Sequence, residues 1–165
     1  SIDKVVHSTL TVTALPASLI SAANNRGSSL SSIDGYVVHS DGLSTIDILN
    51  LTTEVVTASP VNFGTTFIQV GCNDNVNNVG YFGKSPGALY SYDFSTDTIT
   101  NLGVSTTSIT GLSGAGNSLL NGYFSGASAI DRFSFATATS VAVNALSFSG
   151  ALGASISTFQ TSGLL

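Results

Sequence analysis

The sequence predicts an all-β fold built from four repeats of about 41 residues, and three observations lead to this prediction. Short segments of alternating apolar and polar residues recur along the chain and are rich in Val, Ile and Thr, which is typical of β-strands. Segments that begin with glycine and an aromatic residue recur at intervals of 45 and then 42 residues. Finally, 165 residues are enough for one domain with one core, so the repeats must share it.

Each repeat opens with a glycine and a tyrosine at the start of a short strand. These openings are Gly35 and Tyr36, Gly80 and Tyr81, and Gly122 and Tyr123. We expect the three tyrosines to fill the space between neighbouring repeats. The single domain, residues 1–165, then divides into repeats at approximately 1–34 plus 163–165, 35–79, 80–121 and 122–162.

A second strand in each repeat carries an aspartate among apolar residues. The four aspartates are Asp3, Asp47, Asp93 and Asp131. Because they recur at points that look equivalent, we expect a repeated backbone task, such as accepting amide hydrogen bonds at a turn. The alternative is a ring of four carboxylates around a cation, but a Ca²⁺ site needs six or more oxygens and no second acid recurs beside them.

The two ends of the chain together supply one repeat. Residues 2–6 and 9–13 match the second and third strands of a repeat, with no first strand before them. Gly163–Leu165 lies 41 residues after Gly122 and matches that missing first strand. We therefore expect the C-terminal strand to complete the first repeat, either in its own chain or in a neighbouring subunit. Four repeats of this length predict a β-propeller-like ring, an arrangement that protects strand edges.

The repeat motifs carry a family resemblance. The segments Tyr81–Gly83, Tyr123–Gly126, Tyr90–Thr96 and Ile130–Phe133 resemble kelch-type propeller blades, and more closely the low-charge repeats of bacteriophage tail and capsid-associated proteins. The resemblance covers nearly the whole chain and implies a propeller that serves a structural role in a virion. The sequence departs from kelch repeats in lacking their paired glycines and, with no tryptophan in the chain, their later Trp.

The composition excludes several classes of partner. Charged residues make up 8% of the chain, the net charge is −5 and the isoelectric point is about 4.4, so no basic surface is available for nucleic acid. The chain contains no uninterrupted apolar run long enough to predict membrane insertion. The lone cysteine, Cys72, excludes a disulfide between two cysteines of this chain and a metal site built from several cysteines.

The sequence predicts neither a catalytic site nor a cofactor or metal. The two histidines, His7 and His39, are not placed beside a nucleophile by any motif. Zinc or copper sites use three or four His or Cys ligands, and the chain has three such residues without motif spacing. The glycine-rich stretch 111–116 is followed by no lysine, so it predicts a connection rather than a phosphate-binding loop.

The leading hypothesis is a non-catalytic structural or adhesion module, in a virion surface, a tail or an extracellular assembly. Its partners would be further copies of the chain or other structural proteins. The alternative is a carbohydrate-binding, lectin-like propeller whose ligand contacts come from two tyrosines and a polar run. These candidate contacts are Tyr90, Tyr92, Asn73, Asp74 and Asn75.

Overall fold

The computed structural model of the chain describes residues 2–6, 8–16, 18–20, 28–31, 36–40, 45–64, 68–84, 86–107, 114–117, 120–126, 129–145 and 154–156. All elements in these ranges are β-strands, which confirms the all-β prediction. Of the expected repeat positions, Gly35 and Gly163–Leu165 lie outside the described residues.

The strands form one hairpin and three larger sheets in chain order. The N-terminal hairpin pairs β1 (Asp3–Val6) with β2 (Thr11–Ala14). The second sheet holds β3 (Ser28–Ser31), β4 (Tyr36–Ser40), β5 (Ile46–Asn50) and β6 (Val56–Ala58). The third sheet holds β7 (Ile68–Asp74), β8 (Val79–Lys84), β9 (Ala88–Asp93) and β10 (Thr98–Ser105). The fourth sheet holds β11 (Gly114–Asn117), β12 (Asn121–Ser125), β13 (Ala129–Ser134), β14 (Thr139–Ala145) and the parallel strand β15 (Ala154–Ile156).

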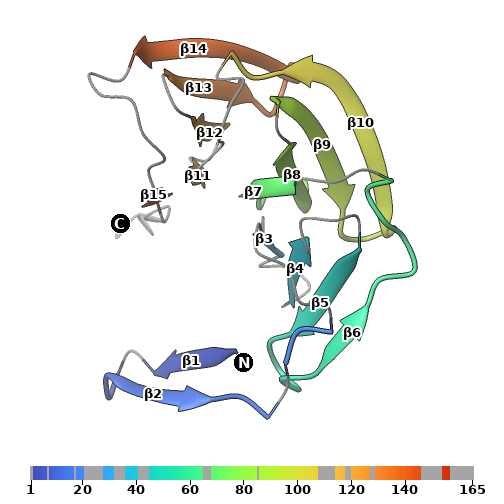
Figure 1. Cartoon of the computed structure of the whole chain (residues 1–165), viewed down its shortest axis with the longest axis vertical. Helices are drawn as coiled ribbons and strands as arrows, with labels where there is room; N and C mark the ends of the chain where they lie inside the picture. Colours follow the sequence, from blue (N-terminus) through green and yellow to red (C-terminus); the bar gives the residue numbers. More distant parts are fainter. Residues whose placement is uncertain are drawn as a thin grey trace, which may run out of the picture.

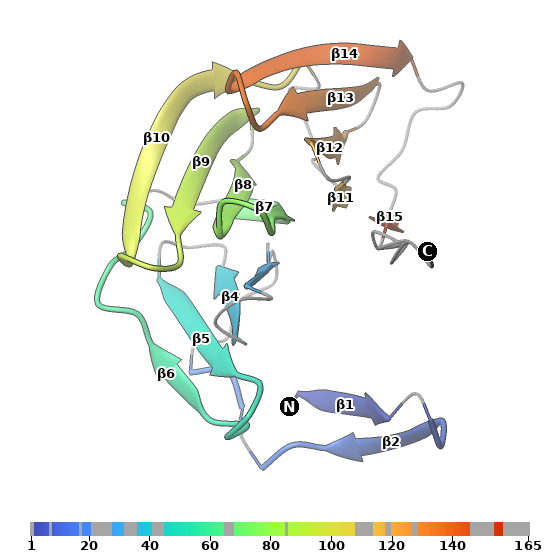
Figure 2. The same ribbon diagram turned by 180° about the vertical axis from the view of Figure 1, so that it is seen from behind.

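The hairpin and the three sheets follow one another around an open arc (Figure 1). Strands β3, β7 and β11 lie toward the inside of the arc, and β6, β10 and β14 form its outer rim. Seen from behind, the arc has the same opening between the N-terminal hairpin and β15 (Figure 2). The described strands therefore do not close into a ring.

One type of turn joins the last two strands of every sheet and provides a common origin for numbering the repeats. It ends on a residue with positive φ, between 50° and 58°, at Leu10, Glu54, Asp97 and Ala138. In three of these turns two threonine hydroxyls, on either side of that residue, lie 2.7–2.8 Å apart: Thr9 and Thr11, Thr96 and Thr98, Thr137 and Thr139. The shared geometry makes Val6, Asn50, Asp93 and Ser134 equivalent, each being the fourth residue before the positive-φ position.

This register corrects the expected equivalence of the four aspartates. Asp3, Asp47 and Asp131 each lie three residues before the start of the turn, opposite Ala14, Ala58 and Ala142. Asp93 is itself the first residue of its turn, where its carboxylate accepts hydrogen bonds from the N–H groups of Ser95 at 2.8 Å and Thr96 at 3.1 Å. The residue equivalent to Asp47 in the third sheet is therefore Tyr90.

The glycine-tyrosine openings need a similar correction. Tyr81 lies opposite Ser91 and Tyr123 opposite Arg132, each partner two residues before the start of its turn. In the second sheet that place belongs to Val38, opposite Ile48, so Tyr36 is two residues out of register. Side chains in a strand alternate with a period of two, so a shift by two preserves the face of the sheet and the pattern could not reveal the shift.

Two of the equivalent aspartates tie neighbouring sheets together. Asp47 is 2% exposed and accepts a hydrogen bond from the N–H of Ile20 at 3.0 Å. Asp131 is fully buried and accepts bonds from the N–H of Thr107 at 3.1 Å and from its hydroxyl at 2.6 Å. Ile20 follows β2 and Thr107 follows β10, so each carboxylate binds the connector that arrives from the preceding sheet. We call this contact the aspartate clasp.

The third sheet holds its connector by an aromatic contact instead. Phe63, in the connector after β6, packs on Tyr90 with ring centroids 5.9 Å apart and planes at 78°. Its ring also lies 5.1 Å from that of Phe82. A connector is thus bound at the same place in three sheets, twice by a carboxylate and once by an aromatic ring.

Two hydrophobic cores fill the spaces between consecutive sheets. The first core, between the second and third sheets, comprises Ile46, Phe63, Ile68, Phe82, Tyr90, Tyr92 and Phe94. The second core, between the third and fourth sheets, comprises Val70, Cys72, Tyr81, Leu89, Phe124 and Phe133. The core of this protein is therefore divided among the interfaces between sheets, where inward-facing residues of both partners meet.

Replacing the clasp residue Asp131 with alanine should destabilise the fold by about 2–3 kcal/mol, because both hydrogen bonds from Thr107 to a buried, charged acceptor are lost. Asp93→Ala is the matched control, since its carboxylate serves an exposed turn, and should cost only about 0.5–1 kcal/mol. Urea unfolding of both variants measures the difference. Equal losses would contradict the assignment of different tasks to these two aspartates.

Gly122 is required by close packing, and its replacement tests the second core. A Cβ at this position would lie 2.6 Å from the sulfur of Cys72 and 3.3 Å from the ring of Phe135. We expect Gly122→Ala to cost about 1–3 kcal/mol through overpacking. Adding Cys72→Ala should recover part of that loss, because it removes the nearest atom. A double-mutant cycle of unfolding free energies measures the coupling, and additive losses would contradict this contact.

Candidate functional site

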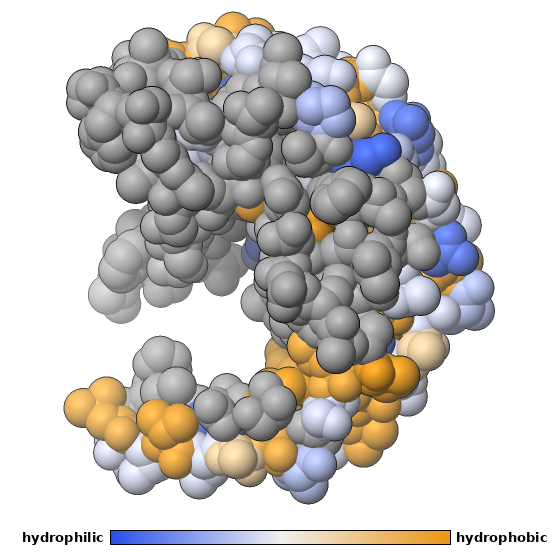
Figure 3. Space-filling view, viewed as in Figure 1, coloured by the Kyte–Doolittle hydropathy of each residue, from blue (hydrophilic) through white to orange (hydrophobic). Residues whose placement is uncertain are grey.

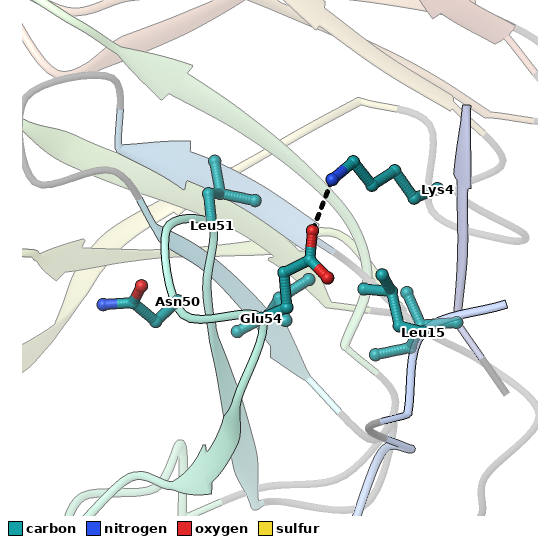
Figure 4. A pocket seen from close by; sticks show the side chains of 7 residues that line it. Lys4, Leu15, Asn50, Leu51 and Glu54 are labelled. Atoms are coloured by element: carbon teal, nitrogen blue, oxygen red, sulfur yellow. Dashed lines mark hydrogen bonds and ion pairs between the residues drawn. The ribbon is translucent and has the colours of Figure 1, made fainter. Parts of the chain in front are cut away.

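A pocket of about 220 Å³ separates the N-terminal hairpin from the second sheet. Ile2, Lys4 and Leu15 line it from the side of the hairpin, and Leu49, Asn50, Leu51 and Glu54 line it from β5 and the turn that follows (Figure 4). Four of the seven lining residues are leucine or isoleucine. The pocket is therefore an apolar space with two charged side chains.

Those two charges form an ion pair across the pocket. The ammonium of Lys4 lies 2.5 Å from Oε1 of Glu54, and the two side chains are 50% and 30% exposed (Figure 4). An exposed pair of this kind contributes about 0–1 kcal/mol to stability, so it is easily rearranged. It connects the hairpin to the second sheet without filling the apolar space beneath it.

The wall of the pocket is shaped by the turn after β5. The side chain of Asn50 accepts hydrogen bonds from the N–H groups of Thr52 at 2.9 Å and Thr53 at 2.8 Å, which fixes the turn. Leu49 and Leu51 flank Asn50 and both line the pocket. Opposite them, the N–H of Leu15 donates to the carbonyl of Ile2 at 2.8 Å and extends the pairing of the hairpin.

Apolar side chains also gather on the surface around this pocket. Figure 3 shows hydrophobic residues over the N-terminal hairpin and the adjoining part of the second sheet. Well-exposed members of this group are Leu10, Val12, Leu51 and Val55. Leu10 and Val12 belong to the hairpin and Leu51 and Val55 to the turn after β5, so the exposed apolar side chains form two groups.

The two tyrosines expected to form a ligand platform are buried instead. Tyr90 is 9% exposed and Tyr92 is fully buried, and both belong to the first core. The hydroxyl of Tyr92 donates a hydrogen bond to the carboxylate of Asp97. The prediction that these rings face a ligand is therefore wrong; they face the second sheet and its connector, because the interface between sheets needs large side chains.

The expected polar contacts form a turn that satisfies its own hydrogen bonds. The carboxylate of Asp74 accepts bonds from the N–H groups of Val76 and Asn77 and from the side-chain amide of Asn77, at 3.0, 3.2 and 2.6 Å. The amide of Asn73 donates to the side-chain oxygen of Asn75 at 2.7 Å. Asp74 is buried, so its principal task is to hold this turn.

Asp74 also affects two neighbouring groups in the second core. Burial, and then the Asp74 carboxylate, raise the pKa of the Cys72 thiol far above its ordinary value. The same two causes, followed by Cys72 itself, raise the pKa of Tyr81 to about 12. Cys72 is therefore held as a neutral thiol, without the thiolate that a cysteine nucleophile requires.

The remaining candidate sites are only partly covered by the structure. Within the described residues, no group of three or more His, Cys, Asp and Glu side chains is arranged to hold a metal ion. The same residues contain no helix long and apolar enough to cross a membrane. His7 and residues 111–113 of the glycine-rich stretch lie outside the described ranges, and residues 114–116 belong to β11.

Sequence reasoning missed the pocket because its residues carry no distinctive chemistry. One signal was present: Leu49 and Leu51 flank the first residue of their turn, as Phe133 and Phe135 flank Ser134. That pattern becomes visible only after the turns fix the register of the repeats.

Comparison with known proteins yields structural neighbours only. No family model and no curated protein matches the chain. The crystal structure of an auxiliary nutrient binding protein from Bacteroides thetaiotaomicron is similar with a TM-score of 0.62 at 14% identity, over 85% of this chain and 36% of the other. A computationally designed protein, Ika8, gives a TM-score of 0.49 at 13% identity, over 78% and 38% of the two chains. This chain thus spans little more than a third of either neighbour.

The raised pKa of Tyr81 predicts a loss of stability at high pH. Between pH 10 and 12 the tyrosine ionises in the unfolded chain and stays protonated in the folded one, so the free energy of unfolding falls as pH rises. Tyr81→Phe should reduce this fall, whereas Tyr123→Phe serves as the control. Denaturant unfolding at pH 9, 10 and 11 measures both slopes. An unchanged slope in Tyr81→Phe would contradict the predicted contribution.

Proposed function

We propose that this chain is a non-catalytic assembly module of β-propeller type, which acts by joining further β-strands to the arc of sheets. The observation that supports it is the two-stranded N-terminal hairpin. By the register of its turn, this hairpin corresponds to the last two strands of the other sheets, which hold four or five strands. Among the described strands, β1 pairs only with β2. An unpaired strand edge is a template for pairing with another chain.

The composition favours a structural or adhesive setting for this assembly. With only 13 charged residues in 165, the surface offers little electrostatic repulsion between neighbouring copies. Exposed apolar side chains lie on the hairpin and on the turn after β5, and apolar surface of this kind favours contact with a partner. A virion surface, a tail or an extracellular assembly is the setting we propose, with further copies or other structural proteins as partners.

A binding role is the second candidate, and one observation favours it. The neighbour with a TM-score of 0.62 is described as a nutrient binding protein. Against a carbohydrate ligand stands the burial of Tyr90 and Tyr92, which removes the expected aromatic platform. A glycan array probed with the chain at high concentration should therefore give no signal. Binding of one glycan class, lost in Asn75→Ala and retained in Asn101→Ala, would favour the binding role instead.

Light scattering over a wide concentration range tests the assembly proposal. We expect the native mass to rise from 16.7 kDa to multiples of that value as concentration increases. The measurement is repeated in 0.5 M salt, because association through backbone pairing and apolar contact survives screening, whereas association through surface charges weakens. A constant mass of 16.7 kDa at all concentrations would contradict the proposal.

A further inference from the structure

The pocket beside the N-terminal hairpin matches a place in the second core that is filled. Counting from the turns, five pocket residues have equivalents two interfaces further along the arc, between the third and fourth sheets. Ile2 and Leu15 correspond to Leu89 and Leu102, and Leu49, Leu51 and Glu54 correspond to Phe133, Phe135 and Ala138. All five equivalents belong to the second core or pack against it.

Tyr81 occupies that place in the second core. Its ring lies 4.9 Å from the ring of Phe133 and is stacked on Phe135 at 5.1 Å, with planes 8° apart. Tyr81 belongs to β8, the strand that pairs with β9 on the side away from β10. The N-terminal hairpin has equivalents of β9 and β10, and no described strand occupies the position of β8 beside it.

The pocket therefore corresponds to the space that the Tyr81 side chain fills between the third and fourth sheets. Tyr81 lies opposite Ser91, and the residue equivalent to Ser91 in β1 is Lys4, which lines the pocket. A strand added to β1 in the same register would place one large side chain opposite Lys4, between the hairpin and the pair Leu49 and Leu51. We call this pocket the socket.

We propose that the socket receives Leu164 from the segment Gly163–Leu165 of a second copy of this chain. The proposal rests on the assembly function proposed above and names its contact. Gly163–Leu165 repeats the order of one glycine and two large residues found in Gly80–Phe82 and Gly122–Phe124. In the register of β8 on β9, Gly163 would lie opposite Val5, Leu164 opposite Lys4 and Leu165 opposite Asp3.

The size and chemistry of the socket suit a leucine. Its volume of about 220 Å³ exceeds that of an apolar cavity of about 150 Å³ that admits benzene. Its apolar lining consists of leucine and isoleucine side chains. The Lys4 and Glu54 side chains of the ion pair are partly exposed, so they can remain hydrated when a leucine enters. The aliphatic stem of Lys4 can cover the incoming side chain while its ammonium keeps Glu54 as partner.

The positions of the strands favour a second copy as the donor. β15, the described strand nearest to the C-terminal segment in sequence, pairs with β11 in the fourth sheet. That sheet and the N-terminal hairpin lie at opposite ends of the arc in both views (Figures 1 and 2). A strand exchanged between copies would join the fourth sheet of one copy to the N-terminal hairpin of the next, and the same contact would repeat from copy to copy.

Cysteine cross-linking between differently tagged chains tests the contact. A Lys4→Cys chain is mixed with a Leu164→Cys chain at concentrations where assemblies form, and the mixture is oxidised with oxidised glutathione. We expect a mixed disulfide dimer on a non-reducing gel. Directly opposed residues on paired strands bring their Cβ atoms to about 4.5–5.5 Å, close to disulfide range after small adjustments. The native Cys72 is buried and does not compete.

Leu165→Cys replaces Leu164→Cys in the matched control. Neighbouring residues of a strand face opposite sides, so its yield with Lys4→Cys should be at least tenfold lower. Equal yields would overturn the register. A chain that carries both Lys4→Cys and Leu164→Cys is also oxidised at low concentration. If it forms only the disulfide within one chain and no dimer, the donor is not a second copy. If no cross-link forms while light scattering shows assembly, the socket contact is wrong and the assembly function stands.

A second variant tests the socket without a cross-link. Leu164→Asp places a carboxylate in the apolar space and should raise the concentration at half-assembly at least tenfold, whereas Leu164→Phe should leave it within about threefold. Urea unfolding of both variants at low concentration checks that the sheets are intact. Equal assembly by the wild type and Leu164→Asp would overturn the proposal.

Discussion

The packing of consecutive sheets against one another is the constraint on which the rest of this structure depends. The interfaces that hold the two cores bury large side chains from both partners, as the rings of Tyr81, Phe133 and Phe135 show. A sheet in the middle of the arc is apolar on both faces, so each face needs a neighbour. The third sheet therefore packs against a neighbour on each side, one through the first core and one through the second.

The aspartate clasps act within this constraint. A buried carboxylate is costly unless its hydrogen bonds are satisfied, and Asp47 and Asp131 meet that demand with backbone donors of a connector. The third sheet reaches the same end with the rings of Phe63 and Tyr90. The carboxylate and the aromatic contact occupy the same position in the repeat. The sheets therefore share the need to bind a connector, but they bind it by different chemistry.

Much of the fold could be predicted from the sequence, because alternation and β-branched residues identify strands directly. The register could not, because moving Tyr36 by two residues keeps its face, and because Asp93 resembles Asp47 in sequence while its side chain caps a turn. The candidate contacts Tyr90 and Tyr92 failed for a related reason: an aromatic ring suits a ligand platform and an interface between sheets equally well. Residues such as Leu49 and Leu51 become informative only beside their equivalents.

The clasps also set the mechanical unit of the chain. Because Asp131 holds Thr107, the connector after β10 is fastened to the fourth sheet, and the connector after β2 is likewise fastened to the second sheet through Asp47. Under tension along the backbone, these two connectors would lengthen only after the hydrogen bonds of their clasps break. Release of one sheet with its connector would then lengthen the chain by about 42 residues, or roughly 14 nm of extended backbone.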